Sequence, residues 1–180
     1  MRRTIINSVI KDTVTFIQTS DETNSKITEL ELTLMPNGGN FSHYHKAFTE
    51  TFTAIDGVLG LKLGDKEIKI LQPNETYAVG PNQVHSFFNP GDKEIRFNIK
   101  ITPGHTGFEN SLRILYGLAE DGLTDKKSMP RSLAHIAVIG SLSDSYLPGF
   151  MRILSPILNF LAKRAKQSGL EKKLIDKYCQ

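Results

Sequence analysis

The pattern of apolar and polar residues changes near residue 104. Before that point, short runs of Thr, Ile, Val, Leu and Phe alternate with polar residues, as in 26–34 and 57–63. An alternation with a period of two is typical of half-buried β-strands. Turn-forming Gly, Pro, Asn and Asp separate the runs, and the pair Gly64-Asp65 predicts a hairpin. We therefore expect residues 1–104 to form an antiparallel β-sandwich or barrel.

After Pro103-Gly104 the apolar residues recur at a spacing of three and four, which is typical of amphipathic helices. This spacing occurs in 112–119, 133–140, 153–161 and 170–178. Pro148 and Pro156 are expected to break or bend the third of these stretches. The pattern predicts three or four α-helices in residues 105–180, packed on the barrel or across a dimer interface.

Length and composition are those of an ordinary globular protein. A chain of 180 residues accommodates one domain with an appendage, and 39% hydrophobic with 23% charged residues excludes a disordered or collagen-like chain. Cys179 is the only cysteine, so a disulfide scaffold and a thiol-only metal cluster are excluded. No apolar run of signal-peptide length follows Arg2-Arg3, and we expect a cytoplasmic location.

Charge is distributed unevenly along the chain. Residues 151–180 hold seven basic and two acidic residues, a net charge of +5, which leaves −2 for residues 1–150 out of a total of +3. The body has no basic patch interleaved with aromatic residues, so we expect no nucleic-acid partner. The apolar stretch Met151–Leu161 precedes the basic residues, a pattern compatible with a helix on a membrane surface. We favour packing on the barrel or on a dimer partner, without membrane contact.

Candidate chemistry is concentrated in the segment that begins at His43. In a strand, His43 and His45 would face the same side because side chains alternate between faces. Glu50 opens the next alternating run, so a carboxylate on a neighbouring strand can join the two imidazoles. His85 lies 35 residues beyond Glu50, and a barrel could bring it opposite, although sequence spacing alone does not establish this.

These residues resemble the two motifs of the cupin family. The first motif is a glycine, HxH, three or four residues, Glu, six residues and Gly, and it is matched by Gly38 or Gly39, His43, His45, Glu50 and Gly57. The second motif is matched at His85 and Asn89, whereas its Gly, Pro and second Gly fall on Asn74, Gly80 and Asn82. Asparagine tolerates the left-handed backbone that glycine supplies, so these substitutions are mild. The resemblance covers about residues 25–103.

The resemblance implies a small single-domain cupin of the cupin 2 type, which is an antiparallel double-stranded β-helix or jelly-roll barrel, here with a helical C-terminal extension. It also implies that His43, His45, Glu50 and His85 bind one divalent transition metal. Nitrogen and oxygen donors of this kind suit Fe, Mn, Ni, Co or Zn better than Ca or Mg.

Cupins include dioxygenases, isomerases and decarboxylases, and they commonly form homodimers. The resemblance therefore implies a protein that binds or acts on a small oxygenated metabolite. A non-catalytic barrel that captures a sugar or another metabolite, with the helices reporting its presence, is the alternative. No catalytic residue other than the metal ligands is identified.

Aromatic residues flank the four metal-ligand candidates in the sequence. Phe41, Phe52 and Phe87 are the candidates for the substrate pocket, with packing in the barrel core as the alternative. His105 and His135 have no partner nearby in the sequence, and we expect structural roles for both.

Overall fold

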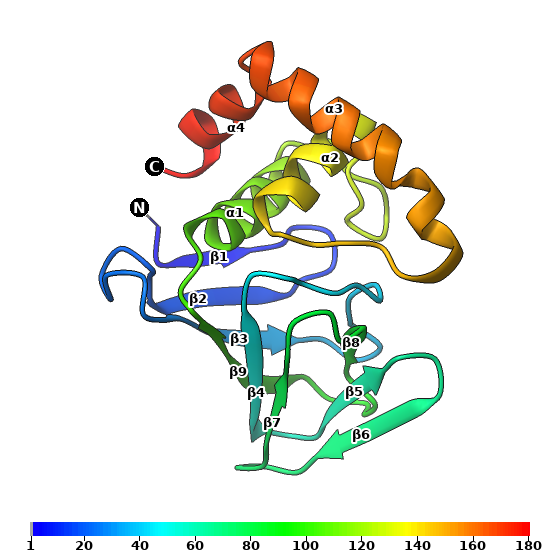
Figure 1. Cartoon of the computed structure of the whole chain (residues 1–180). Helices are drawn as coiled ribbons and strands as arrows, with labels where there is room; N and C mark the ends of the chain where they lie inside the picture. The colour runs from blue at the N-terminus through cyan, green and yellow to red at the C-terminus, as the bar shows by residue number, and fades with distance from the viewer. Residues whose placement is uncertain (1) are drawn as a thin grey trace.

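A computed structural model describes residues 2–180 of the chain, as two antiparallel β-sheets with a layer of helices on one side (Figure 1). The strands are β1 (Thr4–Ile6), β2 (Thr13–Gln18), β3 (Thr28–Leu34), β4 (Thr49–Asp56), β5 (Leu59–Leu63), β6 (Glu67–Leu71), β7 (Thr76–Val79), β8 (His85–Phe88) and β9 (Ile95–Thr102). The helices are α1 (Thr106–Glu120), α2 (Leu133–Leu142), the 3-10 helix η1 (Gly149–Leu154), α3 (Ser155–Gln167) and α4 (Leu170–Tyr178).

All strand pairs in the two sheets are antiparallel, which confirms the predicted fold class. The larger sheet has the order β1-β2-β3-β9-β4-β7, and the smaller sheet has the order β6-β5-β8. The predicted hairpin is present between β5 and β6, where Leu63 pairs with Glu67 and Gly64 adopts a φ of +61°. An isolated bridge between Gly39 and Phe88 links the segment before β4 to the smaller sheet.

The inner face of the larger sheet follows the alternation in the sequence. On β9 the side chains of Ile95, Phe97, Ile99 and Ile101 are buried, as are those of Leu30, Leu32 and Leu34 on β3. Their polar neighbours lie on the outer face, where Glu31 forms an ion pair with Arg96 across the two strands. The apolar face of β9 is therefore the interior, as the sequence predicts.

Helix α1 belongs to two cores at once. Its residues Phe108 and Tyr116 pack into the apolar cluster of the sheets, and Ile114 and Leu118 pack into a second cluster with Val138 and other residues of the helical layer. An amphipathic helix normally has one apolar stripe against one neighbour. Because α1 has two such stripes, it joins the helical extension to the β-region.

The stretch Met151–Leu161 is not one bent helix. It comprises most of η1 and the first half of α3, with Pro156 in the first turn of α3. Proline is favoured there because the first helical N–H groups have no partner within the helix. Only part of this stretch is covered by the rest of the chain, since its exposed apolar side chains are Met151, Ile153, Leu154, Ile157 and Phe160.

None of the helices formed by residues 2–180 combines the length and the apolar character that a membrane-spanning segment needs.

Glu109 ties α1 to the sheet. Its Oε1 accepts hydrogen bonds from the Ser20 amide and the Thr28 hydroxyl, both at 2.6 Å, while Oε2 lies 3.8 Å from the Arg113 guanidinium. Arg113 is buried and stacks over the Phe16 ring at 3.6 Å, and its guanidinium nitrogens have no hydrogen-bond partner among residues 2–180. The Glu109 carboxylate therefore compensates the buried charge of Arg113 and accepts hydrogen bonds from two buried donors, the Ser20 amide and the Thr28 hydroxyl.

We expect Glu109→Ala to lower the free energy of unfolding by about 3–5 kcal/mol, because it leaves the buried Arg113 charge without a partner. Urea denaturation measures this change. Glu109→Gln keeps a side-chain acceptor and should cost less. The control is Glu120→Ala, also in α1, which removes an exposed ion pair with Arg2. It should lower the free energy of unfolding by less than about 1 kcal/mol. Equal effects of the Glu109 and Glu120 alanine variants would contradict this account.

Candidate metal centre

The segment that carries His43 and His45 is extended, but it is not the regular strand that the sequence predicts. His43 forms an isolated bridge with His85, through hydrogen bonds of 2.9 and 2.8 Å between their backbones, and Tyr44 forms a second bridge with Tyr146. The two bridges lie on opposite sides of the segment because successive residues of an extended chain alternate. His43 and His45 therefore point the same way, as expected, without a continuous ladder.

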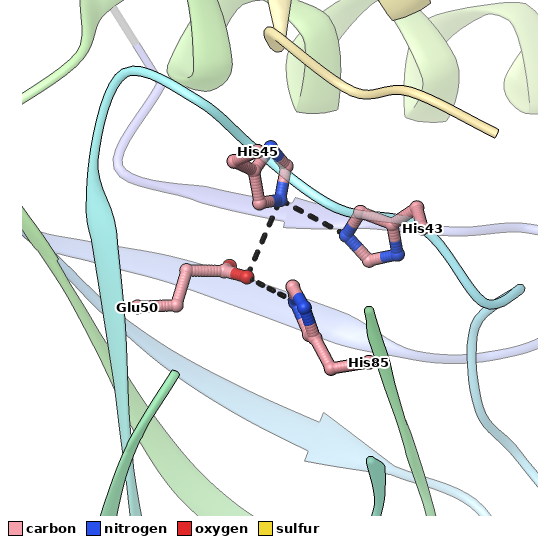
Figure 2. Close-up of side chains that lie close together, drawn as sticks. All are labelled: His43, His45, Glu50 and His85. Atoms are coloured by element: carbon pink, nitrogen blue, oxygen red, sulfur yellow. Dashed lines mark hydrogen bonds and ion pairs between the residues drawn. The ribbon is translucent and has the colours of Figure 1, made fainter. Parts of the chain in front are cut away.

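The four predicted ligand residues converge on one point (Figure 2). Glu50 projects from the start of β4 and His85 from the first residue of β8, and one donor atom from each residue lies within 4.8 Å of all the others. Nε2 of His85 is 2.6 Å from Oε2 of Glu50, and Nε2 of His45 is 3.3 Å from the same oxygen. Nε2 of His43 is 3.0 Å from Nε2 of His45.

The backbone holds the outer nitrogen of each ring. The acceptors for Nδ1 are the carbonyl oxygens of Phe41 for His43 (2.8 Å), Ser143 and Asp144 for His45 (3.1 Å each) and Gln83 for His85 (3.0 Å). A carbonyl oxygen only accepts hydrogen bonds, so these contacts assign the proton of each neutral ring to Nδ1. The Nε2 atoms of the three rings face inward, and the contact of 2.6 Å between Nε2 of His85 and the Glu50 carboxylate needs a proton on that nitrogen as long as no metal is bound.

Burial and mutual contact shift the pKa values of the cluster. Burial lowers the pKa of His43 to about 4, against a smaller opposing effect of the Glu50 charge. Burial alone would raise the pKa of Glu50, but hydrogen bonds from His45 and His85 outweigh it and hold that pKa below its usual value. Burial also lowers the pKa of His85, and the hydrogen bond to Glu50 more than reverses this. Glu50 is therefore ionised and gives the cluster its negative charge.

Glycine and asparagine occupy the backbone positions that the two motifs require. Gly57 has a φ of +76°, and a Cβ added there would lie 2.5 Å from Cγ2 of Ile95. Asn74 and Asn82 have φ values of +72° and +64°. The asparagines thus adopt the left-handed conformation that glycine would supply, as expected from the sequence.

A cavity of about 330 Å³ opens beside the cluster, and His43 and Glu50 are part of its wall. Of the three predicted pocket residues, Phe41 and Phe87 line this cavity and Phe52 does not. Phe52 lies two residues after Glu50 on the inward face of β4, where its ring is fully buried near Phe87. Only Phe41 and Phe87 are thus positioned to contact a ligand, and Phe52 belongs to the barrel core.

The remaining histidines lie outside the cluster. His105 caps α1, because its Nδ1 accepts a hydrogen bond from the Phe108 amide at 2.9 Å. His135 lies in α2 and belongs to no group of potential ligands among residues 2–180. The structural role predicted for His105 is therefore confirmed.

Sequence reasoning missed the segment that follows α2. Ser143 and Asp144 supply the carbonyls that orient His45, and the Asp144 carboxylate accepts hydrogen bonds from the backbone N–H groups of Lys46 and Ala47 at 2.6 and 2.7 Å. A separation of 98 residues between Asp144 and Lys46 leaves no signal in the sequence pattern.

Comparisons with known proteins give one family match, and it lies within the β-region. Residues 30–101 match the model of the Cupin domain family. No curated protein matches the chain.

Solved structures that resemble this chain include a protein with a double-stranded beta-helix domain from Klebsiella pneumoniae, 21% identical over 50% of this chain and 75% of its own, with a TM-score of 0.45. The Cupin_2 domain of an XRE family transcriptional regulator from Enterobacter cloacae is 22% identical over 51% and 95%, with a TM-score of 0.45. A predicted oxalate decarboxylase from Thermotoga maritima is 15% identical over 52% and 81%, with a TM-score of 0.49.

The pKa shifts predict how metal-free protein titrates. The His43 imidazole should stay neutral in the folded protein to about pH 4, whereas the unfolded chain takes up this proton near pH 6.5. This group therefore has no effect on the stability of the fold above pH 6.5 and destabilises the fold progressively as the pH falls from 6.5 to about 4, because only the unfolded chain takes up the proton there. In protein treated with a chelator, NMR titration should give His43 a midpoint near pH 4 and His85 one above 6.5. A His43 midpoint near 6.5 would contradict the partly buried position of this ring in the cluster.

Proposed function

We propose that the β-region, whose residues 30–101 match the Cupin domain family, binds one divalent transition metal ion and uses it to bind and transform a small oxygenated metabolite. The ligands are His43, His45, Glu50 and His85. The observation that carries the proposal is the approach of two Nε2 atoms, on His43 and His45, to 3.0 Å while each ring uses its Nδ1 proton on a carbonyl. Two ring nitrogens at this distance share a proton or a metal ion, and with both Nδ1 atoms engaged elsewhere a metal ion can bind the two Nε2 atoms together with the Glu50 carboxylate.

The donor set fits such an ion. Three imidazole nitrogens and one ionised carboxylate suit Fe, Mn, Ni, Co or Zn. Hydrogen bonds from the outer nitrogens to backbone carbonyls are the usual support of metal-bound histidine, since they set the tautomer and the ring orientation. The ligand residues His45, Glu50 and His85 are buried, so the site is protected from bulk water on the barrel side.

The arrangement supports chemistry on the cavity side. When bound, the metal supplies Lewis acidity to an oxygen atom of the substrate, which is the common element of the dioxygenase, isomerase and decarboxylase reactions of cupins. His43 and Glu50 line the cavity, so a substrate reaches the donor set from there. The packed core around Phe52 closes the opposite side and restricts access to this one direction.

A metabolite sensor is the second candidate, and the contacts between the metal loop and the helices favour it. His45 Nδ1 contacts the carbonyls of Ser143 and Asp144, and the Tyr44 ring stacks on Tyr146 with centroids 5.3 Å apart. A change at His45 on ligand binding would therefore be transmitted directly to the end of α2. The cytoplasmic location and the homodimer expected from the sequence stay predictions.

Replacing His45 with Ala should remove most of the bound metal, because it deletes one of four donors. We expect about one equivalent of metal per chain in the purified wild type and less than a tenth of that in His45→Ala, measured by elemental analysis. His135→Ala is the matched control and should keep full occupancy, while circular dichroism should give the same β-content for all three proteins. Full occupancy in His45→Ala, or an equal loss in His135→Ala, would contradict the assignment.

Turnover separates the enzyme from the sensor. Metal-loaded protein is incubated with a panel of small oxygenated metabolites, and oxygen uptake, isomerisation and carbon dioxide release are followed. Turnover that disappears in His45→Ala supports the enzyme. Saturable binding of a metabolite without conversion supports the sensor instead.

A further inference from the structure

The cavity beside the metal centre is enclosed jointly by the β-region and the helical extension. One wall is the inner face of the larger sheet, with Leu30, Leu32 and Ile99. The other wall is α1 and α2, with residues such as Leu115 and Ile139. Its volume of about 330 Å³ is at the lower end of the range for pockets that hold organic ligands.

These walls select against strongly hydrated molecules. Aliphatic side chains cannot replace the hydrogen bonds that sugar hydroxyls or phosphate oxygens make in water, and an unpaired polar group costs several kcal/mol on burial. Lys127 is the only Lys or Arg among the described residues that line the cavity, and it is exposed, whereas the carboxyl groups of Asp12 and Glu50 face the same space. A polyanionic ligand would lack counter-charges there.

A second polar group lies at another part of the cavity wall. Asp12 and Tyr116 both line the cavity and are only 6% and 7% exposed. The Asp12 carboxyl accepts one long hydrogen bond, of 3.4 Å, from the Met35 amide, and the Tyr116 hydroxyl has no protein partner within residues 2–180. Burial raises the pKa of Asp12 to about 6. Both side chains thus retain hydrogen-bonding capacity for a ligand.

The two polar groups are separated by the width of the sheet. Asp12 directly precedes β2, and Glu50 lies on β4, three steps away in the order β2-β3-β9-β4. Neighbouring strands are about 4.8 Å apart, which gives about 14 Å across the sheet. The register places Thr13 level with Asp56, six residues beyond Glu50 on β4, so the two positions are also offset by about 20 Å along the strands.

We propose that the ligand of the metal centre is an elongated, mostly apolar molecule with an oxygen donor at the metal end and a hydroxyl or amine at the end held by Asp12 and Tyr116. This inference rests on the proposed metal site and narrows its substrate class. It disfavours sugar phosphates and small dicarboxylates, because their anionic groups would find one cationic side chain, Lys127, among the described lining residues.

Binding of two hydroxamic acids to metal-loaded protein tests the apolar part. Acetohydroxamic acid and octanohydroxamic acid share one chelating group and differ by six methylenes, each of which tightens binding about fourfold when fully buried. If binding realises half of this gain in free energy, octanohydroxamic acid should bind at least about 50-fold more tightly than acetohydroxamic acid in isothermal titration calorimetry. Equal affinities in metal-loaded protein would overturn the proposal and leave the metal site intact.

A variant in α2 tests whether the tighter binding of the longer hydroxamic acid arises in this cavity. A Cβ added at Gly140 meets only the Ser145 carbonyl oxygen outside its own helix, at 3.6 Å, so Gly140→Leu has room to extend into the cavity. It should weaken octanohydroxamic acid at least tenfold and leave acetohydroxamic acid unchanged. Ser141→Leu adds the same side chain at the exposed neighbouring position and should change neither affinity. An unchanged chain-length dependence in a folded Gly140→Leu protein would overturn the proposal.

The polar end is tested with 12-hydroxydodecanohydroxamic acid, whose longer extended chain suits this separation. Wild type should bind it at least as tightly as dodecanohydroxamic acid, and Asp12→Leu should bind it at least tenfold more weakly than dodecanohydroxamic acid. The reverse order in wild type would overturn the polar end of the proposal. If the protein takes up no metal, the proposed function fails, and comparison of 1-butanol with 1-octanol, which need no metal, still decides whether the cavity selects apolar chains.

Discussion

Three hydrogen bonds from imidazole to backbone determine what this site is. In His43, His45 and His85, Nδ1 is directed at a main-chain carbonyl, and the opposite nitrogen is thereby directed at the centre of the cluster. With the outer nitrogens engaged, the inner nitrogens and the Glu50 carboxylate form one compact group of potential metal donors.

The carbonyls come from both parts of the chain. Phe41 and Gln83 belong to the β-region, whereas Ser143 and Asp144 follow α2. The helical extension therefore completes the donor set by orienting His45, and it also supplies one wall of the cavity. Helix α1 makes this possible because its two apolar stripes hold the helices against the sheet. The extension thus contributes to the site as well as to the fold.

Short-range patterns in the sequence were sufficient for much of this structure. The two-residue alternation located the buried face of β9, and the HxH spacing with Glu50 identified ligands that the fold brings together. Asn74 and Asn82 were recognisable as glycine substitutes because their backbone conformation depends on the residue itself.

Features that depend on distant contacts could not be obtained in this way. No local pattern indicates that residues 143–146 lie beside residues 43–47. The alternation placed Phe52 on the inward face of β4. It did not indicate how far from the cavity the Phe52 side chain lies, and that distance decides whether the ring packs in the core or lines the cavity. In the same way, the apolar spacing of Met151–Leu161 predicted a face to be covered, whereas coverage depends on what packs nearby.

Anomalous diffraction from crystals of the purified protein is the most direct test of the central claim. Data collected on both sides of the absorption edge of the metal found by elemental analysis locate that metal without reference to the donor set. We predict a single strong anomalous peak per chain, enclosed by Nε2 of His43, His45 and His85 and by the carboxylate of Glu50. A peak elsewhere, or a ring of His85 turned away from the other three residues, would contradict the account.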